Sequence, residues 1–193
     1  MRTILLGVAI AAAIAQAEEE TLNVTVCVEY RGVEFKTAHR ARGVASAIYR
    51  EIGVRLDWNM CHRKPESDVR IRFRYETPKD AAPGVIAYAL PYEGKTVEIY
   101  YERVVQSARS YPGEFLGHVM AHEIAHVLQG VARHSEEGVL KARWSVDEQE
   151  RMAFRPMSFT ARDGDLIRRG IRARDVARAG LRESARTAAG TGK

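Results

Sequence analysis

Hydrophobic side chains recur at every second position in several short segments of the first half of the chain, a period typical of β-strands with one buried face. Between the first two segments, apolar residues instead recur at helical spacing over residues 37–52 and stop at Gly53, which predicts a helix. A strand, a helix and a second strand in this order are typical of a right-handed crossover. The pattern predicts five strands, at residues 22–30, 54–61, 69–75, 84–90 and 96–101.

The third predicted strand carries a row of arginines. Arg70, Arg72 and Arg74 alternate with apolar residues and therefore share one face of the sheet. Such a row could bind a ligand, but one face of a sheet is often solvated. We interpret the row as a solvated sheet face.

The second half of the chain has a helical period. Apolar residues over 115–129 predict a buried helix that ends at Gly130. Ser145 and Glu148 have the capping-box spacing that begins a short helix. Thr160 and Asp163 begin another helix, which continues toward residue 176. The small and polar residues near the end of the chain predict a flexible C-terminal tail over 181–193.

The first 17 residues have the pattern of a secretory signal peptide. Arg2 precedes twelve uncharged residues, 4–15, and an A-x-A cleavage site ends at Ala17. A membrane anchor is the alternative, but twelve helical residues extend about 18 Å, whereas the hydrocarbon core is roughly 30 Å thick. The sequence therefore predicts cleavage after Ala17, one mature domain over 18–180, no membrane span, and secretion to the periplasm or the medium.

Secretion changes the meaning of the two cysteines, because an oxidising compartment allows Cys27 and Cys61 to pair. Both lie on the polar face of a predicted strand, so a disulfide between them is possible. Two separate thiols are the alternative. We expect the disulfide.

The formal net charge of +5 is concentrated near the C-terminus. Residues 141–193 contain 13 of the 30 Lys and Arg residues but only 7 of the 25 Asp and Glu residues. The arginines over 162–186 could bind an acidic ligand, but the acidic residues among them favour a solvated helix. We expect no nucleic-acid partner.

The predicted helix over 115–129 contains an H-E-x-x-H motif formed by His122, Glu123 and His126. Residues four apart on a helix project from one face, so the two histidines can share one Zn²⁺. Glu123 is rotated by about 100° from His122 and is placed as a general base rather than a ligand. Two core histidines beside a solvated glutamate are the alternative, but burying these groups without a partner costs several kcal/mol. His118 is one turn earlier, and we interpret it as a packing or supporting residue, because three ligands in one row cannot surround a tetrahedral ion.

A catalytic zinc site needs a third protein ligand. His134 follows His126 by eight residues, and a sharp turn at Gly130 would bring it under the helix. A solvated loop histidine is one alternative. A second alternative takes Asp147 or Glu148 as a carboxylate ligand.

These motifs resemble the metzincin zinc peptidases and in particular their matrixin-like branch. The motif, Gly130, His134 with Ser135, and the apolar turn at 138–140 follow the family order of H-E-x-x-H, glycine, histidine and Met-turn. Residues 84–91 are similar to the matrixin edge strand. The chain departs from the family pattern in two ways: the glycine and the third histidine follow the second histidine by four and eight residues instead of three and six, and Leu140 replaces the Met-turn methionine.

The resemblance implies an α+β, zincin-like fold. In this fold a twisted five-stranded mixed sheet with an antiparallel edge strand is backed by two helices, and further helices follow the zinc site. The resemblance also implies a monomeric zinc metalloendopeptidase, in which His122, His126 and His134 bind Zn²⁺ and Glu123 activates water. A peptide or protein substrate would lie along the edge strand. The substrate-binding residues would be Val85, Ile86, Ala87, Tyr88, Ala89 and Leu90. A zinc-stabilised peptide-binding module without turnover is the alternative.

Overall fold

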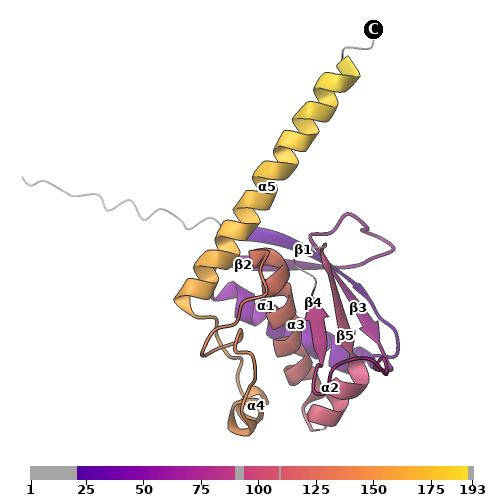
Figure 1. The fold of residues 1–193 in the computed structure, drawn as a ribbon, viewed down its shortest axis with the longest axis vertical. Helices are drawn as coiled ribbons and strands as arrows, with labels where there is room; N and C mark the ends of the chain where they lie inside the picture. The colour runs from indigo at the N-terminus through magenta and orange to yellow at the C-terminus, as the bar shows by residue number, and fades with distance from the viewer. Residues whose placement is uncertain (1–20, 90–93, 109, 191–193) are drawn as a thin grey trace, which may run out of the picture.

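The computed structural model describes residues 21–89, 94–108 and 110–190, with side chains up to residue 187. The predicted signal peptide and Leu90 lie outside the described residues. One five-stranded sheet has the order β2-β1-β3-β5-β4 (Figure 1). Its strands are β1 (Leu22–Glu29), β2 (Val54–Met60), β3 (Val69–Arg74), β4 (Ala87–Ala89) and β5 (Thr96–Tyr100).

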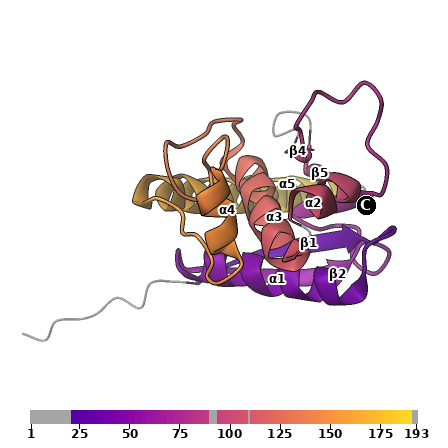
Figure 2. The ribbon, with the colours of Figure 1, turned by 90° about the horizontal axis from the view of Figure 1, so that it is seen from below.

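The strands are parallel except for β4, which pairs antiparallel with β5 at the edge of the sheet. The helices are α1 (Phe35–Arg50), α2 (Tyr101–Ser107), α3 (Pro112–Gln129), α4 (Val146–Met152) and α5 (Ala161–Gly190). Figure 2 shows α1 and α3 side by side along the sheet. The predicted mixed sheet, its antiparallel edge strand and the later helices are therefore confirmed.

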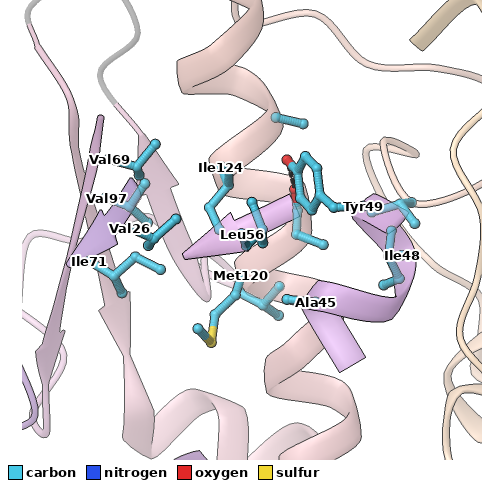
Figure 3. Packing of buried hydrophobic residues seen from close by; sticks show 14 of the residues in the cluster. Val26, Ala45, Ile48, Tyr49, Leu56, Val69, Ile71, Val97, Met120 and Ile124 are labelled. Carbon is cyan, nitrogen blue, oxygen red and sulfur yellow. Dashed lines mark hydrogen bonds between the residues drawn. The ribbon is translucent and has the colours of Figure 1, made fainter. Parts of the chain in front are cut away.

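The core fills the space between the sheet and these two helices. Figure 3 shows Met120 and Ile124 of α3 between the side chains of the strands and those of α1. A Cβ atom on Gly117 would lie 2.5 Å from Cβ of Val44, so this glycine permits the close approach of α3 to α1. The Tyr49 hydroxyl donates a hydrogen bond of 3.0 Å to the carbonyl of Ala121. Contacts along its length thus hold α3 in place.

The opposite face of the sheet carries the arginine row. Arg70 forms an ion pair of 2.9 Å with Glu29, and Arg74 forms one of 2.6 Å with Glu98. Arg72 lies within 3.4 Å of both carboxylates. The arginines of this face are therefore paired with acidic residues of neighbouring strands.

Cys27 and Cys61 form a disulfide that joins β1 to the end of β2. Both residues are buried. The structure thus contains the disulfide that the sequence predicts.

Three elements differ from the sequence-based expectation. Strand β4 contains three residues instead of the predicted 84–90, because the preceding segment bends away and the carbonyls of Ala82 and Val85 accept hydrogen bonds from Arg103. Helix α2 follows β5 directly and was not expected. Helix α5 continues to Gly190, into the predicted tail, since alanine and arginine are strong helix formers. The flexibility of 181–193 stays a prediction.

Figure 1 shows the end of α5 extending beyond the body of the protein. None of the described helices is long and apolar enough to span a membrane.

Candidate metal centre

Helix α3 and the loop that follows it bring three histidines together. His122 and His126 are buried on α3, whereas His134 is exposed on the loop. The helix ends at Gly130, whose φ of 70° turns the chain back. The imidazole nitrogens of the three histidines lie within 4.8 Å of one another, so the structure brings together all three predicted ligands.

The hydrogen bonds of the first two rings fit a bound cation. Nδ1 of His122 lies 2.8 Å from the carbonyl of Val139, and Nδ1 of His126 lies 3.3 Å from that of Val131. A carbonyl accepts only, so both Nδ1 atoms carry the proton and both Nε2 atoms present a lone pair. These Nε2 atoms are only 2.9 Å apart. Two lone pairs this close together are placed to share one cation.

The spacing of the nitrogens suits zinc. Zn–N bonds of about 2.0–2.1 Å at tetrahedral angles place ligand nitrogens about 3.4 Å apart. The Nε2 atoms of His122 and His126 are 2.9 Å apart, and the ligand nitrogens of all three histidines lie within 4.8 Å of one another, so small shifts of the rings would bring them to this spacing. Three histidine nitrogens at these distances therefore form a donor set that suits Zn²⁺.

Burial keeps the two helical histidines neutral. Burial, together with the neighbouring His126, lowers the pKa of His122 to about 3. Burial likewise lowers the pKa of His126 to about 4. At neutral pH no proton therefore competes with a metal for these nitrogens.

Glu123 is buried, and burial raises the pKa of its carboxyl to about 8. A hydrogen bond from the backbone of Ala89 lowers this pKa in part. Ala89 belongs to the edge strand β4. The candidate base and the candidate substrate strand are thus in direct contact.

His118 serves the structure rather than the metal. Its Nδ1 donates to the carbonyl of Glu114 at 2.7 Å, and its Nε2 accepts from the backbone N–H of Met157 at 3.0 Å. Both ring nitrogens are therefore used, as expected for a packing or supporting residue. The indole of Trp144 lies edge-on between His118 and His122, with ring centroids 6.4 and 5.7 Å away.

The carboxylates that could replace His134 lie outside the cluster. Glu148 accepts a hydrogen bond of 2.8 Å from Lys141 and caps α4 together with Ser145. The hydrogen bond from Lys141 is the largest cause that lowers the pKa of Glu148 to about 2. Asp147 is exposed. Within the described residues, neither belongs to a group of side chains that could hold a metal.

The turn after His134 is held from both sides. The backbone N–H of Ser135 donates to the carbonyl of Leu140 at 2.8 Å, and Leu140 is fully buried. Gly138 has a φ of 74°, and a Cβ atom there would lie 2.6 Å from the carbonyl oxygen of Ser158. These contacts place Leu140 in the core directly after the turn.

The predicted substrate-binding residues lie partly on the edge strand. Ala87, Tyr88 and Ala89 form β4. Ile86 precedes the strand, and its carbonyl accepts a hydrogen bond of 2.9 Å from the N–H of Tyr100. Val85 belongs to the preceding bend.

Sequence reasoning did not identify Asp163 and Arg133, which hold the ligand loop. Arg133, which directly precedes the candidate ligand His134, donates to Asp163 at 2.7 Å. In the sequence, Asp163 is recognisable only as part of a helix start, because its partners on the loop, Ser135 and Arg133, lie 28 and 30 residues away.

No protein-family model matches the chain, and no curated protein matches it in sequence. Solved structures do match its fold. The archaemetzincin of Methanopyrus kandleri has a TM-score of 0.54 at 14% identity, covering 80% of this chain and 98% of that chain. The archaemetzincin of Archaeoglobus fulgidus, crystallised with malonate, has a TM-score of 0.48 at 15% identity, covering 75% of this chain and 99% of that chain. The chain thus has a zincin-like α+β fold, and its place in the matrixin-like branch stays a prediction.

Proposed function

We propose that the protein is a zinc-dependent metallopeptidase that cleaves internal peptide bonds. The observation that carries the proposal is the convergence of three imidazoles, two of them neutral with facing lone pairs, beside a buried carboxyl group. A similar fold in a protein named archaemetzincin supports it.

His122, His126 and His134 would hold the metal. The carbonyls of Val139 and Val131 fix the rings of the first two by accepting from Nδ1, which leaves the Nε2 lone pairs free to bind a metal. A zinc ion in such a site acidifies its bound water and polarises a substrate carbonyl.

Glu123 would move the proton. A group that both accepts and returns a proton works best when its pKa is near the working pH. Burial raises the pKa of Glu123 to about 8 in the metal-free protein, and a divalent cation nearby would lower this pKa, so that the carboxylate form would be present at neutral pH. The carboxylate takes a proton from the attacking water and then gives it to the departing amide nitrogen. Ala89 holds this carboxyl through its backbone. A substrate on β4 would therefore lie next to the base.

The edge strand would bind the substrate. Among the described strands, β4 pairs only with β5 and ends the sheet, so its other edge could pair with an extended peptide. Main-chain hydrogen bonds of this kind do not depend on side chains, so they can hold a peptide of any sequence. The substrate class is therefore an extended or unfolded segment of a protein.

We also propose that the protein is exported and cleaved after Ala17. The disulfide between Cys27 and Cys61 supports export, because such bonds persist in oxidising compartments. N-terminal sequencing of protein recovered from the periplasm or the medium should begin at Glu18. Intact Met1 in protein retained in the cytoplasm would contradict export.

The decisive experiment combines metal analysis with digestion. Purified full-length protein should contain about one zinc per chain and cleave unfolded casein. A chelator should stop the cleavage, and added Zn²⁺ should restore it. One zinc per chain without cleavage would favour the peptide-binding module, and protein that never binds zinc would refute the proposal.

A further inference from the structure

A buried carboxylate lies at the start of α5, close to the loop that carries His134. The side chain of Asp163 is fully buried. Its oxygens accept hydrogen bonds from Thr160 at 2.7 Å, from Arg133 at 2.7 Å and from Ser135 at 2.7 Å. The carboxylate thus joins the first turn of α5 to a distant segment.

Two of these partners flank His134 in the chain. Arg133 precedes it and Ser135 follows it, and the Arg133 guanidinium also donates to Oγ of Ser135 at 3.1 Å. A closed set of hydrogen bonds therefore fixes the backbone on both sides of the third histidine. The backbone N–H of Ser135 adds a further bond, to Leu140 at 2.8 Å.

His134 itself has little other support. Its side chain is exposed and makes no hydrogen bond with another described residue. Its ring contacts those of His122 and His126, with centroids 5.2 and 4.9 Å away. The direction of this ring therefore depends on the neighbouring backbone, and Asp163 anchors that backbone.

Asp163 also neutralises the positive charge of Arg133. Arg133 directly precedes His134 in the chain, so its guanidinium belongs to the same loop. An unpaired cation on this loop would oppose the binding of a divalent ion. Asp163 neutralises it with a short ion pair of 2.7 Å.

We propose that Asp163 is the positioning residue of the metal site, which holds the His134 loop in its binding position and neutralises Arg133. The inference rests on the proposed zinc site and extends it to α5.

The chain contains a matched control for testing this proposal. Asp68 is also buried and accepts hydrogen bonds from the backbone and hydroxyl of Thr25, at 2.7 and 2.6 Å, and from Arg178 of α5. It therefore links α5 to the body in the same way, but through β1 instead of the ligand loop. Asp163→Asn and Asp68→Asn should both lower the melting temperature of the metal-free protein.

The zinc affinity should separate the two variants. Competition with a chromophoric chelator should show binding about 10- to 100-fold weaker in Asp163→Asn and nearly unchanged in Asp68→Asn. If Asp163→Asn does not fold, Ser135→Ala removes one bond to the same carboxylate and should weaken binding several-fold.

Each outcome bears on the proposal. Unchanged affinity in Asp163→Asn or, where that variant does not fold, in Ser135→Ala would overturn the positioning role. So would an equal loss in Asp68→Asn, since the effect would then be one of general stability. Wild-type protein that binds no zinc would refute the proposed function itself.

Discussion

The candidate metal site has a helical half and a loop half, and the two are built by different means. His122 and His126 are buried four residues apart on α3, which packs against α1 and the sheet. His134 is exposed on a loop whose backbone is tied to α5 through Asp163. In the helical half, local geometry directs the ligands. In the loop half, contacts between residues far apart in the chain direct the ligand. This half is therefore easier to disturb.

The largest expected effect comes from removing the loop ligand. His134→Ala should leave the protein largely free of zinc after dialysis, because two histidines hold the ion far more weakly than three. Its melting temperature in zinc should fall to that of the metal-free protein, since binding to the native state no longer stabilises it. Metal analysis and thermal unfolding with and without chelator measure both.

Asp147→Ala and Glu148→Ala are the controls. Each should retain about one zinc, and Glu148→Ala should lose only the stability of a helix cap, about 1 kcal/mol. If His134→Ala keeps its zinc while one of these variants loses it, a carboxylate is the third ligand.

The next effect concerns the base in the helical half. Glu123→Ala should keep its zinc but lose a factor of about 10² to 10⁴ in kcat/KM, as is typical when a general base is removed. Glu150, exposed on α4, offers a control, because Glu150→Ala should leave kcat/KM unchanged. Activity retained in Glu123→Ala would disprove the assignment of the base.

The same carboxyl should make stability depend on pH. In the folded protein Glu123 keeps its proton up to about pH 8, whereas in the unfolded chain it loses the proton near its ordinary value of 4.5. Its contribution to the free energy of unfolding therefore falls as the pH rises through this window. Glu123→Gln cannot ionise, so it should gain on the order of 3 kcal/mol relative to wild type between pH 5 and pH 8.

Urea unfolding of the metal-free proteins at pH 5, 6.5 and 8 measures this gain. His122 and His126 titrate alike in both proteins, so they cancel in the difference between the two curves. A difference that does not change with pH would show that burial leaves the pKa of this carboxyl near its ordinary value.

The difference between the two halves also explains what the sequence could predict. Alternation and helical spacing identified the strands, α1 and α3, because both patterns are local. The i, i+4 spacing of His122 and His126 was readable for the same reason. Helix α2 was missed because seven residues directly after a strand show no clear helical period.

The support of the loop could not be predicted in this way. The interaction of Asp163 with Arg133 and Ser135 spans about thirty residues and exists only once α5 has packed against the body. The contact between Glu123 and Ala89 also depends on the fold, since β4 reaches α3 only after pairing with β5. Long-range hydrogen bonds leave no periodic pattern in a sequence.

The smallest expected effect lies at Gly130, where the helical half meets the loop half. Gly130 has a φ of 70°, and a Cβ atom there would meet nothing within 4 Å. Gly130→Ala therefore adds backbone strain without a clash and should cost about 1 kcal/mol in the free energy of unfolding. Gly43 is the matched control, since it also has open space but lies inside α1 with ordinary helical geometry. Gly43→Ala should stabilise the protein by up to about 1 kcal/mol, so urea unfolding should give changes of opposite sign for the two variants. A neutral or stabilising Gly130→Ala would show that the left-handed conformation at this position puts no strain on an alanine.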